Sequence, residues 1–266
     1  MNIYTRDKKI QQELKRQDIQ NLLNYFQQLQ EPVILRDIRK EFSGAKRLDK
    51  DLDFLIANSI ISREDRRYQL SLVPLKEYPT TEKVEMFIEK MAGRYSIEEL
   101  LVWLGEVFWL DDIDEIIAIN YDLPTLNRLE TDSFRLATIN HREKFSETLP
   151  NYFSNMDQPD KFPKLAPLLG DVNTEFFSNQ IELVLERVML RKKPKRTSIF
   201  LDSLVETKVV VAEPEWQVAI PCVDRTQLAD IEIEMNKKEQ FFFGRQLAEQ
   251  LLKGKESFTY MIKKKA

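Results

Sequence analysis

The chain has 266 residues, of which 42% are hydrophobic and 32% are charged, and its formal net charge at pH 7 is −4. This composition predicts a soluble globular protein of one large domain or two to three smaller ones. No apolar run approaches the ~18 residues that span a bilayer, the N-terminus lacks the apolar core of a signal peptide, and a single cysteine, Cys222, excludes an internal disulfide. We therefore expect a cytoplasmic protein that makes no contact with a membrane.

Charge is distributed unevenly along the chain. Residues 1–73 carry 14 basic and 11 acidic side chains, residues 74–190 carry 11 and 22, and residues 191–266 carry 15 and 11. Because the middle segment would repel phosphate, nonspecific binding of nucleic acid over the whole surface is disfavoured. The pattern allows nucleic acid at the two ends of the chain, and it equally allows a basic partner protein on the acidic middle.

The first 75 residues carry the pattern of a winged helix, which is three short helices followed by a β-hairpin. Apolar spacing predicts the helices at residues 18–29, 35–42 and 48–56 and the hairpin at residues 60–72. Asp18 is expected to cap the first helix, Pro32 to end it, and Gly44 to form the turn before the third. The alternative is a generic helical lobe with a separate hairpin.

The side of the third helix that points away from the core decides what this module could bind. In a winged helix that reads DNA, the start of this helix enters the major groove. Its first turn carries Lys46, Arg47 and Lys50, which suit phosphate or guanine contacts. Arg66 and Arg67 at the hairpin tip are expected to add to them. These five residues are the predicted nucleic-acid contacts.

Other residues near this face fit DNA less well. Asp53 would repel phosphate, and Asp49 and Asp51 flank the face. Phe54 is a large apolar side chain on a side that should be exposed, which fits a protein interface at least as well. The alternatives are therefore DNA contact, protein contact through Phe54, and a solvated surface of mixed charge that binds nothing.

Prolines at positions 74 and 79 predict a boundary near residues 75–80, followed by an acidic helical region over residues 76–191. Ser96 and Glu99 form a capping-box signature before one of its helices. Helical patterns are expected at residues 81–91, 96–108, 112–121, 131–145 and 174–191. Residues 150–171, which contain four prolines, are expected to form an irregular connector.

Residues 192–266 are predicted to form a small C-terminal α/β segment. Its elements are expected to be a short helix at residues 198–206, a β-hairpin at 208–220, a helix at 241–252 and a final strand at 258–262. The fold class is therefore α+β and mainly α, with three parts over residues 1–75, 76–191 and 192–266.

No residue pattern points to a catalytic centre. His141 is the single histidine, and we expect it on the surface of a helix beside Arg142 and Glu143. One histidine and one cysteine exclude the usual zinc sites, and the six glycines form no phosphate-binding loop. We therefore assign no catalytic residue, no metal ligand and no cofactor.

Charged clusters along the chain have both a functional and a structural interpretation. The acidic residues within 111–115 suit Mg²⁺ binding, but they are explained more simply as stabilising a helix N-terminus. Asp202, Glu206 and Lys208 are similar to a nuclease motif, although their spacing is too short.

Two clusters are basic. The run at residues 191–196 suits phosphate binding, or stabilisation of the helix that precedes it. Residues 263–265 are expected to form a solvated tail.

Four short segments resemble a known family. They are residues 33–36 (VILR), 61–68 (ISREDRRY), 216–222 (WQVAIPC) and 245–250 (RQLAEQ). The family is an uncharacterised one of streptococci and related lactic-acid bacteria, domain of unknown function 1803. The resemblance implies a bacterial cytoplasmic protein of unknown activity, and it transfers no functional residue.

The sequence thus predicts a non-enzymatic binding protein that uses a winged helix, with DNA binding or regulation as the first hypothesis. A protein–protein interaction module is the second hypothesis, and a metal-dependent enzyme is the third.

Overall fold

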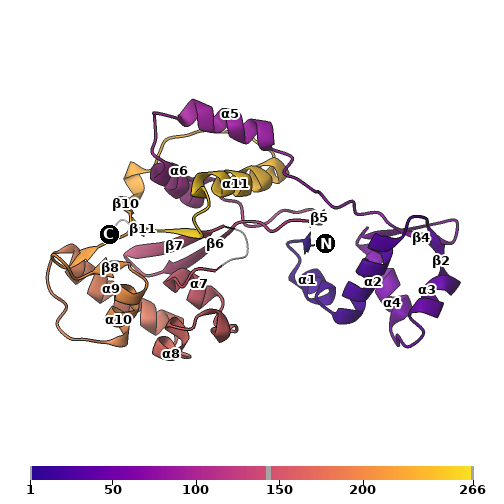
Figure 1. Cartoon of the computed structure of the whole chain (residues 1–266), viewed down its shortest axis with the longest axis horizontal. Helices are drawn as coiled ribbons and strands as arrows, with labels where there is room; N and C mark the ends of the chain where they lie inside the picture. The colour runs from indigo at the N-terminus through magenta and orange to yellow at the C-terminus, as the bar shows by residue number, and fades with distance from the viewer. Residues whose placement is uncertain (1, 142–144, 265–266) are drawn as a thin grey trace. The chain divides into compact units, whose positions relative to one another are not determined.

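A computed structural model describes residues 2–141 and 145–264 of the chain (Figure 1). The protein is α+β and mainly helical, as predicted, and its sheets are small. Two compact units are present. Unit 1 consists of Met1–Pro79 and Leu110–Asp122, and unit 2 of Thr80–Trp109 and Leu123–Ala266. In the described part of the chain, no helix combines the length and apolar character needed to cross a membrane.

Unit 1 contains four helices and two small sheets in its described residues. Its elements are β1 (Asn2–Tyr4), α1 (Lys8–Leu14), α2 (Gln17–Gln28), β2 (Val33–Ile34), α3 (Leu35–Glu41), α4 (Leu48–Ala57), β3 (Ile61–Glu64), β4 (Arg67–Leu70) and β5 (Ile117–Ile119). The strands β2, β4 and β3 form an antiparallel sheet in that order, while β1 pairs with β5.

The three predicted N-terminal helices and the hairpin lie where the apolar spacing placed them. Each helix buries one face in a common core that comprises Leu14, Ile19, Leu22, Leu23, Phe26, Ile38, Leu48, Leu52, Leu55, Ile60, Ile61 and Tyr68. One detail is wrong. Because α2 begins at Gln17, Asp18 lies inside the first turn and Arg16 occupies the N-cap position. In the first turn, the negative charge of Asp18 interacts favourably with the positive end of the helix dipole, but its side chain does not cap the helix.

The β3–β4 hairpin turns through a two-residue loop. Glu64 pairs with Arg67, and the residues between them, Asp65 and Arg66, have φ angles of 48° and 61°. Positive φ at both central residues is the type I′ geometry that matches strand twist, and it normally favours glycine at the second position. Arg66 is thus held in a backbone conformation that an L-amino acid adopts at a cost.

The helix predicted at residues 112–121 is absent. Residues 111–116 are irregular, and β5 runs antiparallel to β1 with Ile119 opposite Asn2. Leu75 also bridges Ile119. The isoleucine spacing matches that of one face of a helix, which explains the wrong prediction, but all three residues of Ile117–Ile119 are buried. Burial on both sides and β-branched side chains favour a strand.

Unit 2 is built around a four-stranded sheet of order β10-β11-β7-β6. The sheet consists of β6 (Thr125–Glu130), β7 (Phe134–Asn140), β10 (Cys222–Asp224) and β11 (Ser257–Lys263), and unit 2 also contains the short strands β8 (Val210–Val211) and β9 (Gln217–Val218). The outer strand β10 runs parallel to β11, whereas the other neighbours are antiparallel. The strands β8 and β9 form the predicted C-terminal hairpin.

Helices cover both faces of this sheet (Figure 1). On one face lie α5 (Thr81–Met91), α6 (Ile97–Trp103), the π-helix η1 (Leu104–Phe108) and α11 (Lys237–Leu252). On the other lie α7 (Leu149–Ser154), α8 (Leu165–Leu169), α9 (Thr174–Met189) and α10 (Ile199–Glu206). The predicted alternation of β11 is present. Phe258, Tyr260 and Ile262 pack in the hydrophobic core on the α5, α6 and α11 side of the sheet, whereas Met261 packs in the core on the α7–α10 side.

Two predictions for the middle of the chain are wrong. The region is not purely helical, since residues 134–140 of the helix expected at 131–145 form β7, a central strand buried on both faces. Residues 142–144 of that expected helix lie outside the described residues. Such strands lack the polar alternation by which sequence patterns identify them. The connector expected at residues 150–171 contains α7 and α8, and Pro150 lies in the first turn of α7, where proline is tolerated.

Candidate functional site

A hollow of about 470 Å³ lies at the start of α4. Three of the predicted nucleic-acid contacts, Lys46, Arg47 and Lys50, line it together with Arg39 and Asp49. These side chains meet because the α3–α4 turn brings the end of one helix next to the beginning of the other. Backbone N–H groups at a helix start add to the attraction for an anion.

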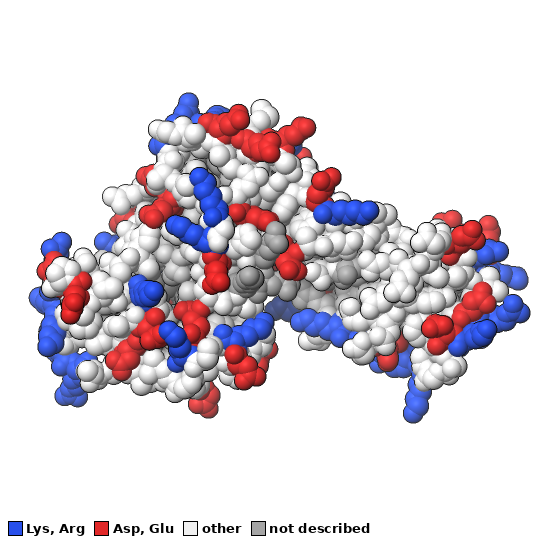
Figure 2. Space-filling view, in the orientation of Figure 1, with Lys and Arg blue, Asp and Glu red and all other residues white. Residues whose placement is uncertain are grey.

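The ion pairs around this hollow adjust its charge. Arg39 donates to the Asp49 carboxylate at 3.0 Å, so these two charges offset one another. Arg47 lies 3.8 Å from Glu13 and 4.0 Å from Asp51. Figure 2 displays basic and acidic residues interspersed over the visible face of unit 1.

Asp51 does not flank the exposed face as predicted. Its side chain is 3% exposed and accepts a hydrogen bond from Arg16 at 2.8 Å. The hydrogen bonds to Asp51 and Glu13 raise the pKa of Arg16 above its ordinary value. The carboxylate therefore joins α2 to α4 and holds the α4 start in place, since a buried charge requires a partner of opposite sign.

The remaining predicted contacts lie on other parts of unit 1. Arg66 and Arg67 are exposed at the β3–β4 turn, and Arg67 donates to the carbonyl oxygen of Pro32 at 3.2 Å. Phe54 is half-buried and packs against the core of unit 1. Only part of its ring is therefore accessible, and its role as a protein contact stays a prediction.

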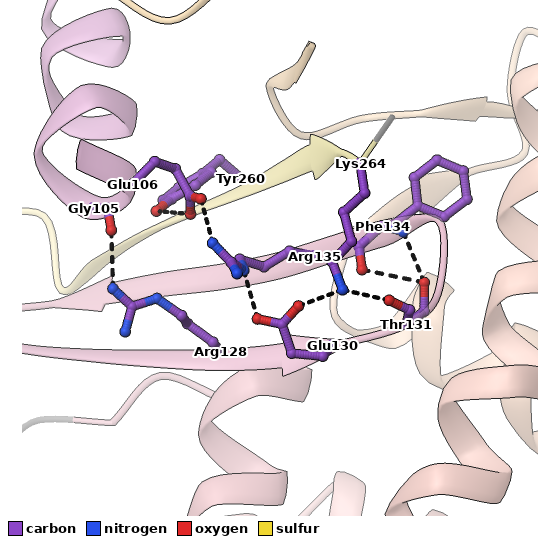
Figure 3. A network of polar contacts seen from close by, with 9 residues as sticks. All are labelled: Gly105, Glu106, Arg128, Glu130, Thr131, Phe134, Arg135, Tyr260 and Lys264. Atoms are coloured by element: carbon purple, nitrogen blue, oxygen red, sulfur yellow. Dashed lines mark hydrogen bonds and ion pairs between the residues drawn. The ribbon is translucent and has the colours of Figure 1, made fainter. Parts of the chain in front are cut away.

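A second polar cluster was not predicted. It lies in unit 2, where η1 meets β6, β7 and β11 (Figure 3). At its inner end Tyr260 donates from its hydroxyl to Glu106 Oε1 at 3.0 Å, and Arg135 donates to Glu106 Oε2 at 2.5 Å. The Glu106 side chain is 3% exposed. Burial, followed by the neighbouring Glu106 carboxylate, raises the pKa of Tyr260 well above its ordinary value.

The cluster continues toward the surface through a chain of charges. Arg135 donates to Glu130 at 2.5 Å, and Lys264 lies 2.6 Å from the other Glu130 oxygen. Burial alone would raise the pKa of Glu130, but the hydrogen bonds from Lys264 and Arg135 outweigh it and hold this pKa below the ordinary value. Residues 263–265 were expected to be a solvated tail; Lys264 instead anchors the end of β11, while Lys265 lies outside the described residues.

Gly105 makes this arrangement possible. A Cβ atom at this position would lie 2.1 Å from the Tyr260 hydroxyl oxygen, so only glycine lets the tyrosine approach η1. The Gly105 carbonyl oxygen also accepts a hydrogen bond from Arg128 at 2.9 Å. π-Helical turns are uncommon and often occur at functional sites. The outer residues Arg128, Glu130 and Lys264 line a hollow of about 630 Å³, whereas Glu106 and Tyr260 serve to position the strands.

One sequence signal pointed to this cluster. Glu106 is the single charge within the apolar run LVWLGEVFWL at residues 101–110, and a charge in a buried helix needs a partner.

The other sequence candidates do not form a chemical centre with one another. His141 follows β7 instead of lying in a helix; its backbone N–H donates to Glu256 O, and its ring lies 3.9 Å from Glu249. Arg142 and Glu143 lie outside the described residues. Because no helix begins at residues 111–115, the helix-dipole explanation of those acids is wrong. Asp114 pairs with Arg6 at 3.1 Å.

The nuclease-like residues were expected just before and on a strand, and this expectation is also wrong. Asp202 and Glu206 lie on α10, and Lys208 follows that helix. Lys164 pairs with Glu206 at 2.6 Å, and this contact raises the pKa of Lys164. Within residues 2–141 and 145–264, no group of three or more His, Cys, Asp or Glu side chains is placed to hold a metal ion.

Fold and polar clusters together define an α+β protein with a basic hollow in one unit and a buried ionic cluster in the other. Residues 1–102 match the family model for a domain of unknown function (DUF1803), which confirms the resemblance to that family over this part of the chain. The match includes residues 33–36 and 61–68, but neither C-terminal segment. No curated protein and no solved structure matches the chain.

Proposed function

We propose that unit 1 is a winged helix that binds duplex DNA through the start of α4. The order α2-β2-α3-α4-β3-β4 and the sheet order β2-β4-β3 support this, since a winged helix has three helices, a short strand after the first, and a closing hairpin. In such a module the third helix enters the major groove. Here that helix is α4, and the β3–β4 hairpin is the wing.

The observation that carries the proposal is the basic hollow at the start of α4. Arg39, Lys46, Arg47 and Lys50 line it, and Asp49 is the acidic residue among the lining side chains. The burial of Asp51 supports the same conclusion, because it withdraws from the surface a carboxylate that would have repelled phosphate. Arg66 and Arg67 on the wing supply further positive charge beside the helix.

The test is a fluorescence-anisotropy titration of labelled duplex DNA with the full chain over a range of salt concentrations. Binding should weaken as salt rises, because phosphate contacts release counterions. The double variant Lys46→Ala and Lys50→Ala should bind more weakly and lower the slope of log affinity against log salt by about two. Lys8→Ala with Lys9→Ala, on α1, is the matched control and should keep more of the slope.

Two results would overturn the proposal. One is an affinity that does not change with salt. The other is equal loss of binding in the α4 variant and in the α1 control, because the proposal assigns the contacts to the hollow and not to general basic charge.

A further inference from the structure

The outer side of α9 carries large apolar side chains that face solvent. Phe176, Leu183 and Leu190 follow one another at seven-residue intervals and are 52%, 61% and 65% exposed. Because seven residues correspond to about two helical turns, they form one stripe along the helix. An exposed apolar stripe of this kind suits packing against the apolar face of another helix.

Positive charge adjoins this stripe. A groove of about 620 Å³ contains Leu183 and Leu190, and its basic lining residues are Arg187, Lys192, Lys195 and Arg196. Glu186 is the acidic residue of the lining. Arg187 also donates to the carbonyl oxygen of Lys193 at 2.6 Å, which fixes the basic segment beside the helix. The partner that fits this surface is a helix with an apolar residue between acidic ones.

The helix α5 of the same chain has this chemistry. Glu82, Glu85, Met86 and Glu89 stand at positions i, i+3, i+4 and i+7, so they share one face of α5. All four are exposed, and Met86 is 69% exposed. Lys83 is paired with Glu239 at 2.7 Å, so it offsets little of this acidic charge. Figure 2 displays acidic residues over α5 and basic residues along the edge occupied by α9 and the segment after it.

We propose that unit 2 self-associates, with α5 of one copy seated on the α9 groove of a second copy. Met86 would insert between Leu183 and Leu190, and the acidic stripe would face Lys192 and Lys195. Within unit 2, α5 and α9 cover opposite faces of the sheet (Figure 1), so one molecule cannot close the contact on itself. Copies therefore join head to tail, through a heterologous interface.

Sedimentation velocity of the full chain over a concentration series, at low and at high salt, measures this association. Assembly should grow with concentration and weaken as salt rises. The loop variant Lys192→Glu with Lys195→Glu, and the helix variant Glu85→Lys with Glu89→Lys, should each weaken self-association at least about tenfold. The matched reversal Lys8→Glu with Lys9→Glu lies outside both surfaces and should leave association unchanged.

The decisive experiment mixes the two charge-reversed variants. The acidic loop of one then faces the basic helix of the other, so the mixture should associate although neither variant does so alone. A folding defect in either variant could not produce this rescue. A wild-type chain that stays monomeric at every concentration, or a mixture that stays monomeric, would overturn the proposal. The DNA titration uses other residues, so the two proposals fail independently.

Discussion

Replacing Gly105 by alanine should disrupt the contact between η1 and β11. The new methyl group would lie 2.1 Å from the Tyr260 hydroxyl oxygen and 3.1 Å from its ring carbon Cζ, so the tyrosine must move and release Glu106. Overpacking in a core costs about 1–3 kcal/mol, and losing a hydrogen bond to a charged acceptor costs about 1.5–3 kcal/mol. Alanine recovers about 0.5–1 kcal/mol through its higher helix propensity. We expect a net loss of about 3 kcal/mol in the free energy of unfolding.

Tryptophan fluorescence is the appropriate assay, because Trp103, Trp109 and Trp216 all belong to unit 2. For a unit of this size, the loss corresponds to a decrease in Tm of about 6–12 °C. Gly244→Ala is the matched control. It lies on α11 in the same core, and its nearest contact would be an ordinary 3.5 Å to Leu104. This control should therefore stabilise unit 2 by up to about 1 kcal/mol.

A double-mutant cycle identifies the cause of the loss. Tyr260→Phe alone should cost about 2 kcal/mol, but it removes the oxygen with which the new methyl group collides. The pair Gly105→Ala and Tyr260→Phe should then cost about 2 kcal/mol less than the sum of the single changes. Additive losses, or a Gly105→Ala protein as stable as the wild type, would refute this reasoning.

Three further results are expected. Arg66→Gly should relieve the backbone strain of the positive φ in the β3–β4 turn and raise the calorimetric Tm of unit 1 by an amount equivalent to about 1 kcal/mol. The same change should weaken DNA binding, and a lower Tm would contradict the turn assignment. Asp51→Asn should weaken DNA binding, because Arg16 loses the buried partner through which it holds the α4 start in place; an unchanged affinity in anisotropy titrations would count against it. Because the folded-state pKa of Glu130 lies below its ordinary value, its stabilising effect is present at neutral pH and is lost as pH falls through that lowered pKa. Glu130→Gln should accordingly be less stable than the wild type in urea unfolding near neutral pH and equal to it in strong acid, and a difference that persists in acid would exclude ionisation as the cause.

The parts of the fold that sequence patterns predicted share a physical property. The helices α2, α3 and α4 each bury one face, and Pro32 and Gly44 separate them, so local spacing was sufficient to locate them. The strand β7 has apolar residues on both faces, and its pattern could not be distinguished from that of a buried helix. Local spacing therefore identifies helices and strands that have one buried face and one solvent-exposed face.

The ionic clusters could not be predicted for a different reason. Glu106 meets Arg135, which is 29 residues away, and Tyr260, which is 154 residues away. Asp51 is buried because Arg16, 35 residues earlier, reaches it. Periodicity indicates which side chains lie on one face, but only the tertiary fold decides which distant charges meet. Lys46, Arg47 and Lys50 could be placed together from helical spacing because they are close in sequence, and their contact with nucleic acid stays a prediction.

The discontinuity of unit 1 affects how the chain can be divided. The family match ends at residue 102, inside α6, whereas unit 1 is completed by residues 110–122. A fragment of residues 1–102 would leave β1 without β5, and would separate α6 from η1, Arg135 and Tyr260. Recombination at residue 102 would break both units at once. Residues 1–102 of this chain are therefore not an independent structural unit, because each compact unit includes residues beyond position 102.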